Sequence, residues 1–236
     1  MGKVIPNVAS WIFYLSYLRE FTLESFYSDK NGHIELFLRK GHLMLCAENA
    51  IYSYDEKYEN FVFAFEQLDP NDLKGLKNVL VLGMGLGSIP LILERQYSHD
   101  FNFTMVEYDE DIADLAQTYS LPRIEGHTEI VMADALAYMQ LNERTFDLIC
   151  IDLFKDKDIP DEFLTASFLQ LCSKALSAQG LVIMNTPGNT MEESCNSEKY
   201  YENDFRKVFP KAARIHLFKN EMLFSRAPSN PLLYGQ

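Results

Sequence analysis

The stretch from Asn78 to Gly87 (NVLVLGMGLG) constrains the fold of this chain more than any other part of its sequence. An apolar run rich in β-formers gives way there to glycines at alternate positions, Gly83, Gly85 and Gly87, and then to a segment with helical spacing. Glycine permits positive φ and close backbone approach, so such a strand-to-helix turn is typical of a nucleotide or nucleoside site. The same spacing also arises in a tight turn that merely packs a helix on a sheet.

Strand and helix patterns alternate from Lys77 onward, which predicts an α/β fold with a doubly wound, mostly parallel seven-stranded sheet. The predicted strands are Asn78–Leu82, Asn102–Glu107, Thr128–Met132, Phe146–Ile151, Gly180–Asn185, Ala213–Phe218 and Met222–Arg226. The predicted helices are Ser88–Gln96, Asp109–Thr118, Ala135–Gln140, Pro160–Leu176 and Glu193–Val208. The last two strands form an antiparallel hairpin, and one antiparallel strand ending a parallel sheet separates this layout from the dinucleotide-binding dehydrogenases.

A small β-rich region is predicted before this domain. The β-like runs His33–Arg39 and His42–Cys46 are separated by the turn-prone Lys40-Gly41, which indicates a hairpin. The segment Glu56–Leu68 then has apolar residues at helical spacing. We therefore expect an N-terminal β-rich region over residues 1–55 and the α/β domain over residues 56–236.

Composition excludes several functional classes. A formal net charge of −13, without a cluster of Lys or Arg, argues against a nucleic-acid partner. The single short apolar segment near the N-terminus supports neither a membrane span nor a signal peptide. Four cysteines without CxxC spacing indicate core residues in a reducing, cytoplasmic compartment. Five histidines without HxH or HExxH spacing predict no metal site.

Acidic residues stand at or just after the ends of three predicted strands, where ligands bind to open parallel sheets. Glu107 lies twenty residues past Gly87, the separation expected of an acid that binds ribose hydroxyls. Its alternative role is a solvated acid or a helix cap, for which Asp109 is the better candidate. Asp134, before Ala135, can accept a hydrogen bond from an adenine amine or cap the following helix.

Asp152 directly follows the fourth strand and can bind a substrate cation, accept a proton from an amine, or be an ordinary loop acid. Asn185 ends the fifth strand and either faces the same cleft or caps a turn. A glycine turn and three acids in this order favour a nucleoside site over coincidence.

These motifs resemble the class I S-adenosylmethionine-dependent methyltransferase fold, and within it the spermidine synthase group. The matching segments are VLVLGMGLG, EYDE at Glu107 to Glu110, Asp134-Ala135 and Asp152, and the apolar Val81 before the glycines is typical of that group. The segment YSYDEKY, from Tyr52 to Tyr58, resembles its substrate-side segment. The resemblance implies S-adenosylmethionine, or its decarboxylated form, as cofactor, bound by Gly83, Met84, Gly85, Leu86, Gly87, Glu107, Tyr108, Asp134 and Ala135. It also implies Asp152 as catalytic residue, with Tyr58, Asp55 and Lys155 on the substrate side, where Asn185 is expected from its place at the end of the fifth strand.

Two departures from the group bear on the reaction. Leu86 replaces an aspartate that in the group helps to hold the charged end of decarboxylated S-adenosylmethionine. Lys155 replaces the second aspartate of the substrate loop, where a cation opposes a polyamine. The sequence therefore favours methyl transfer to an unknown small acceptor. Aminopropyl transfer and a non-catalytic protein are the alternatives, and a homodimer is expected because it is common in the group.

Overall fold

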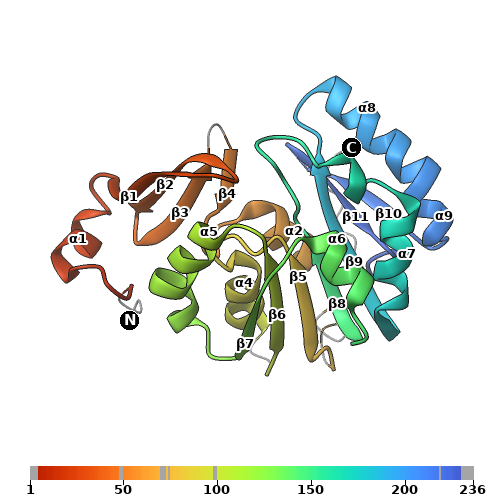
Figure 1. Cartoon of the computed structure of the whole chain (residues 1–236), viewed down its shortest axis with the longest axis horizontal. Coiled ribbons are helices and arrows are strands. Elements are labelled where there is room, and N and C mark those ends of the chain that lie inside the picture. Colours follow the sequence, from red (N-terminus) through yellow and green to blue (C-terminus); the bar gives the residue numbers. More distant parts are fainter. Residues whose placement is uncertain are drawn as a thin grey trace.

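The computed structural model describes residues 5–47, 50–69, 73, 75–97, 100–217 and 219–229, which form two sheets (Figure 1). The larger sheet has seven strands in the order β10-β11-β9-β8-β5-β6-β7. Its strands are β5 (Asn78–Leu82), β6 (Asn102–Glu107), β7 (His127–Met132), β8 (Phe146–Ile151), β9 (Leu176–Pro187), β10 (Ala213–His216) and β11 (Asn220–Phe224). The pairs among β5 to β9 are parallel, which confirms the predicted α/β fold.

The central strands are mostly apolar because both faces of the sheet are covered. Val79 and Val81 belong to one hydrophobic cluster, whereas Leu80 and Leu82 belong to another, and all four are fully buried. The first cluster includes α2 (Glu59–Glu66), α4 (Ser88–Tyr97) and α5 (Glu110–Leu115), and the second includes α6 (Ala135–Leu141), α7 (Ala166–Lys174) and α8 (Met191–Tyr200). The sheet is therefore doubly wound, as predicted.

The terminal hairpin differs from its prediction in the limits of its second strand, which is β11 (Asn220–Phe224) instead of Met222–Arg226, and in the order of its strands. β11 is antiparallel to both β9 and β10, so β10 runs parallel to β9 and forms the edge of the sheet. The antiparallel strand thus lies one position inside the edge, because the second strand of the hairpin inserts beside β9. Phe218, assigned by prediction to the first strand of this pair, lies outside the described residues.

Several helix limits also differ from the prediction. Thr165 and Thr190 cap the helices that begin at Ala166 and Met191, and Thr190 forms a capping box with Glu193. A short 3₁₀ turn (Asp161–Phe163) stands in place of the first predicted turn of α7. After α5 the chain continues as a π-helical turn (Ala116–Ser120) and a 3₁₀ turn (Leu121–Arg123), and after α8 as a π-helical turn (Tyr201–Phe205) and α9 (Arg206–Val208).

A four-stranded antiparallel sheet precedes the larger one, with the strands in chain order. It follows helix α1 (Ser10–Leu15) and consists of β1 (Phe21–Ser28), β2 (Gly32–Arg39), β3 (His42–Ala47) and β4 (Ala50–Ser53). The predicted hairpin corresponds to β2 and β3 and is confirmed. Buried residues of this sheet, such as Ile34 and Leu36, share one hydrophobic cluster with β5 and α4. The division at residue 55 stays a prediction.

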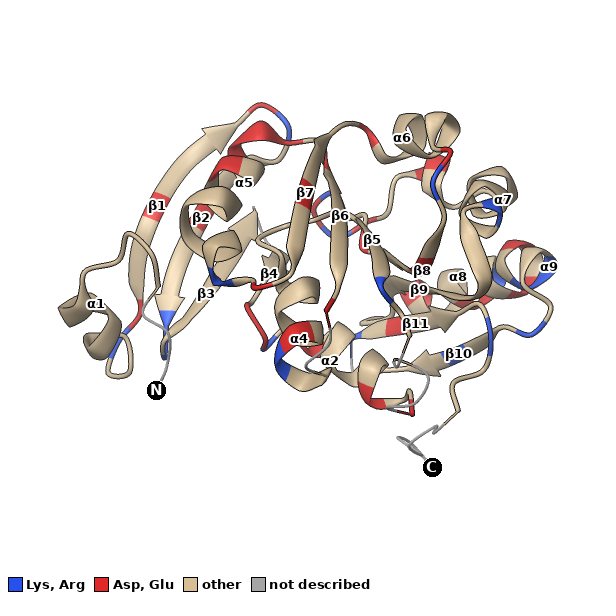
Figure 2. Ribbon diagram, turned by 90° about the horizontal axis from the view of Figure 1, so that it is seen from below, with Lys and Arg blue, Asp and Glu red and all other residues tan. Residues whose placement is uncertain are grey.

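The distribution of charge follows the composition. In Figure 2, lysines and arginines are spread over many elements of the described chain, among more numerous acids. Within the described ranges, no helix is both long and apolar enough to cross a bilayer.

Candidate functional site

A cavity of about 800 Å³ lies where the carboxyl ends of β5 to β9 meet the N-terminal sheet. Its volume is within the range of ligand pockets in proteins. Residues from β4, from the start of α2 and from the loop after β8 close it on one side. Of the predicted site residues, those that line it are Gly83, Gly85, Glu107, Tyr108, Asp134, Ala135, Asp152, Tyr58, Lys155 and Asn185.

The glycine turn is closely packed as well as exposed to the cavity. Gly83 has φ +84° and Gly85 has φ +52°, a region that side chains disfavour. A Cβ at Gly83 would collide with the backbone carbonyl of Asp152, and one at Gly85 would lie 3.1 Å from the carbonyl oxygen of Tyr52. The turn therefore packs tightly and also lines a cavity, and nucleoside binding at the turn stays a prediction.

Three predicted cofactor residues do not line the cavity. The side chains of Met84 and Leu86 are buried in the cluster beneath the sheet. The Gly87 N–H donates to the Met84 carbonyl at 2.9 Å. Because Leu86 points into the core, its side chain is not placed to repel or to hold any charged group in the cavity.

Glu107 is buried, and its carboxylate accepts hydrogen bonds from three backbone N–H groups. Its Oε2 accepts from the Gly85 N–H at 3.2 Å, and its Oε1 accepts from the Tyr108 and Asp109 N–H groups at 2.9 and 3.1 Å. Burial raises the pKa of Glu107, and these donors oppose that shift. A carboxylate has about four acceptor positions. The carboxylate thus retains capacity for a further donor, and its role toward ribose stays a prediction.

Asp109 and Asp134 each cap the N-terminus of a helix. Asp109 accepts from the Asp111 N–H at 3.0 Å at the start of α5, which confirms its predicted capping role. Asp134 accepts from the Ala137 N–H at 2.9 Å and caps α6, so its alternative role is present. Asp134 also lines the cavity, where an adenine contact stays a prediction.

Asp152 lies among polar side chains from three segments. The side-chain amide of Asn185 donates to Oδ1 of Asp152 at 2.9 Å, and the side-chain amide of Asn220 donates to Oδ1 of Asn185 at 2.9 Å. The Tyr58 hydroxyl, at the start of α2, also hydrogen-bonds to the carboxylate. Burial raises the pKa of Asp152 to about 6, although Asn185 and Tyr58 both oppose that shift. A carboxylate with a pKa near 6 in a cavity is suited to general-base chemistry.

Of the predicted substrate-side residues Lys155 and Asp55, only Lys155 lines the cavity. Lys155 is exposed and lines the cavity, together with Lys57 and Lys157. Asp55 does not line the cavity, because it is fully buried in an ion pair with Arg123.

The sequence did not predict the contacts between the N-terminal sheet and the residues that line the cavity. The Tyr52 hydroxyl of β4 accepts from the Asp156 N–H at 2.7 Å and donates to Asn31 at 3.3 Å. Asn31 donates to Asp109 at 2.6 Å. The loop after β8 is therefore connected through the first sheet to α5. Tyr52 stood out in the sequence only as part of the segment YSYDEKY. Its partners, Asn31 and Asp156, lie too far away in the sequence to be predicted from it.

Comparison with known proteins identifies the family. The family model described as "Spermine/spermidine synthase domain" matches residues 65–226. The polyamine aminopropyltransferase of Clostridium botulinum is 31% identical over 146 residues, 60% of this chain and 48% of the relative. That of Alkaliphilus metalliredigens is 28% identical over 140 residues, 57% of this chain and 49% of the relative. The matched segment thus spans about half the length of these relatives.

Solved structures agree on the fold. The spermidine synthase of Thermotoga maritima superposes with a TM-score of 0.65 at 21% sequence identity, covering 86% of this chain and 72% of that one. At this identity the likeness concerns the fold alone, and it confirms the methyltransferase-like arrangement expected from the sequence.

The comparisons contradict the preference for methyl transfer. The relatives are aminopropyltransferases, which was the alternative. The preference depended partly on Leu86, whose side chain is buried in the core instead of facing the cavity. Since the family model matches more than half of the 236 residues, this chain belongs to the spermine/spermidine synthase family.

Proposed function

We propose that this protein is an enzyme that transfers an aminopropyl group from decarboxylated S-adenosylmethionine to a small polyamine acceptor such as a diamine. The observation that carries the proposal is the Asp152 carboxylate, partly buried in the cavity, with a pKa raised to about 6 by burial. Membership of the family and the names of the relatives support the same reaction.

The chemistry requires an uncharged amine nitrogen in line with an electrophilic carbon. That nitrogen attacks the aminopropyl methylene carbon bonded to the sulfonium sulfur. The carbon–sulfur bond breaks, its electron pair stays on sulfur, and methylthioadenosine leaves. Asp152 accepts the proton released by the amine, and Asn185 and Tyr58 hold the carboxylate in place for that transfer.

Other residues that line the cavity are suited to the adenosyl part of the donor. Gly83 and Gly85 present backbone without side chains, and Glu107 offers a carboxylate to ribose hydroxyls. Asp134 and Ala135 stand where the adenine would lie.

The proposal is tested by supplying the purified protein with putrescine and either decarboxylated or intact S-adenosylmethionine. We expect methylthioadenosine and spermidine with the decarboxylated donor, and no methylated putrescine with the intact one. Absence of product, together with no calorimetric binding of either nucleoside, would support a non-catalytic protein.

Lys155 should weaken the binding of a diamine. The substitution Lys155→Asp replaces a cation that lines the cavity with an anion, so we expect KM for putrescine to fall about three- to tenfold, with little change in kcat. Lys207→Asp changes the net charge equally from an exposed position in α9 and should leave KM unchanged. A higher KM in the Lys155 variant would show instead that Lys155 attracts an anionic group of the acceptor.

The predicted homodimer and cytoplasmic location stay predictions. Exposed apolar side chains on and beside α1, such as Trp11, Tyr14 and Leu18, support a homodimer.

A further inference from the structure

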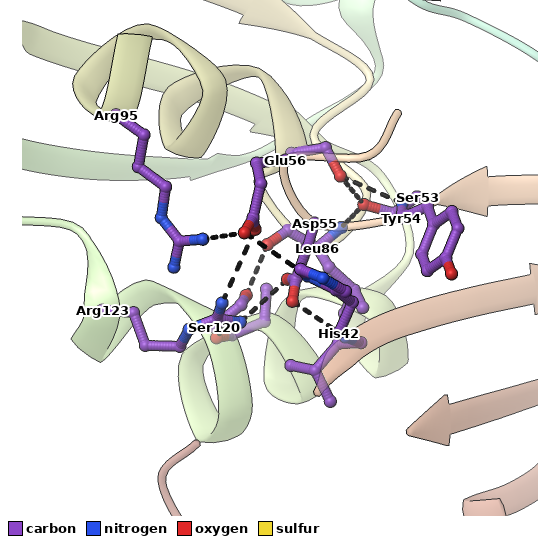
Figure 3. Close-up of polar contacts among 12 residues, drawn as sticks. His42, Ser53, Tyr54, Asp55, Glu56, Leu86, Arg95, Ser120 and Arg123 are labelled. Atoms are coloured by element: carbon purple, nitrogen blue, oxygen red, sulfur yellow. Dashed lines mark hydrogen bonds and ion pairs between the residues drawn. The ribbon is translucent and has the colours of Figure 1, made fainter. Parts of the chain in front are cut away.

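A buried ion pair joins two segments that are far apart in the sequence. Arg123, in the 3₁₀ turn after α5, donates from Nη1 to Oδ1 of Asp55 at 2.8 Å (Figure 3). The side chains are 4% and 0% exposed. Burial raises the pKa of Asp55, and Arg123 opposes that shift. Removing one partner would leave an uncompensated buried charge, so each residue depends on the other.

The backbone at Asp55 needs this support. Asp55 has φ +39°, which is uncommon for a residue with a side chain. Its Oδ2 accepts from the Leu43 N–H of β3 at 2.8 Å. A sparsely populated backbone conformation persists only where its surroundings hold it. The carboxylate of Asp55, held by β3 and by Arg123, therefore fixes the turn between β4 and α2.

A second set of charges surrounds the pair. Glu56 contacts Arg95 of α4 and lies 3.4 Å from Nδ1 of His42. Burial favours a higher pKa for Glu56, but the nearby His42, a backbone hydrogen bond and the charge of Arg95 outweigh burial and lower that pKa to about 2. His42, Asp55 and Glu56 bring potential metal ligands within 4.8 Å of one another. Two arginines already neutralise these acids, so the cluster is suited to a structural role.

Residues of the segment 52–58 contact both the glycine loop (Gly83–Gly87) and Asp152. On one side, the Leu86 N–H of the glycine loop donates to the Ser53 hydroxyl at 3.2 Å. Ser53 also hydrogen-bonds to Ser88 at 2.6 Å, at the start of α4. On the other side, Tyr58 hydrogen-bonds to Asp152. The turn thus connects the glycine loop to Asp152, the proposed general base.

We infer that Asp55 and Arg123 form a positioning pair, which holds the segment 52–58 so that Ser53 supports the glycine loop and Tyr58 supports Asp152. The half of this inference that concerns Tyr58 rests on the proposed function. The half that concerns Ser53 is structural and is testable without turnover.

A double-mutant cycle tests the connection to Tyr58. Asp55→Asn keeps the size and an acceptor for the Leu43 N–H but removes the charge, and asparagine tolerates positive φ. We expect kcat/KM for aminopropyl transfer to fall about ten- to a hundredfold, since small misplacements of catalytic groups are costly. In a Tyr58→Phe background the same change should cost less than about threefold, because both changes disturb one arrangement. An equal loss in both backgrounds would overturn the connection to Tyr58.

Amide hydrogen exchange tests the connection to the glycine loop independently of the reaction. In Asp55→Asn, the exchange rate of the Leu86 amide relative to that of Ile149 in β8 should rise at least about tenfold. Leu169→Ala, in the core of α7, lowers global stability and should not raise this ratio, because global unfolding exposes both amides. An unchanged ratio in Asp55→Asn would overturn the inference even if the enzyme proved inactive.

Arg123→Lys provides a second route if Asp55→Asn fails to fold. It keeps the positive charge but lacks the planar guanidinium that pairs with Asp55. We expect a smaller rise in the same exchange ratio and a smaller loss of kcat/KM. Wild-type values for both would contradict the positioning role.

Discussion

Replacing Asp152 with asparagine should lower kcat by about 10²- to 10⁴-fold, the usual contribution of a general base. Asparagine can still accept from the Asn185 amide but cannot accept a proton from the substrate amine. The measurement is single-turnover formation of methylthioadenosine. Asp158→Asn, an exposed position in the same loop, should retain wild-type activity. Wild-type turnover in the Asp152 variant would exclude this carboxylate as the base.

The raised pKa of Asp152 adds two pH effects to this prediction. In the wild type, kcat/KM should fall below about pH 6 as the carboxylate becomes protonated. Because the pKa in the folded state lies above that in the unfolded state, the wild type loses stability as the pH rises through about 6. The asparagine variant avoids that cost of up to about 3 kcal/mol. Its melting temperature should exceed that of the wild type at pH 7, and the difference should vanish near pH 4.

The substitution Glu107→Gln should weaken the binding of the nucleoside about ten- to a hundredfold. Glu107 is buried at the cavity, where a charged acceptor binds hydroxyl groups more strongly than an amide does. The amide also places an N–H group among three backbone donors, which disturbs the Gly85 contact.

Isothermal titration with methylthioadenosine measures this effect directly. Glu110→Gln is the matched control, since Glu110 is exposed in the first turn of α5 and does not line the cavity. Unchanged affinity in the Glu107 variant, with circular dichroism like that of the wild type, would exclude the ribose role.

Local patterns were sufficient to predict the large sheet. The strands Asn78–Leu82, Asn102–Glu107 and Phe146–Ile151 agree with the prediction residue by residue, because strands buried on both faces carry runs of apolar residues. Limits set by capping were harder to predict. Thr165 and Thr190 begin their helices through side-chain contacts that apolar spacing does not reveal.

The candidate site was predictable where chain order fixes position. The carboxyl ends of parallel strands share one edge of the sheet, so Gly83, Glu107 and Asp152 were expected to meet, and all three line the cavity. Lys155 lies in the loop after β8 and lines the cavity, and it was predicted from the resemblance to the substrate loop of the spermidine synthase group. By contrast, Asp55 was expected beside the substrate, but it is buried in an ion pair with Arg123. The two residues are 68 positions apart in the sequence, so local patterns do not reveal the pair.

The sequence by itself determined the doubly wound fold, the glycine turn and the acids at the strand ends, because each depends on residue spacing within a single strand and turn. Only the tertiary structure decided that Leu86 points into the core, that Asn185 and Tyr58 surround Asp152, and that Arg123 neutralises Asp55. These properties depend on burial and on partners from distant segments. Burial and pairing set the pKa and the accessibility of a side chain, and the adjacent residues in the sequence reveal neither the burial nor the partner.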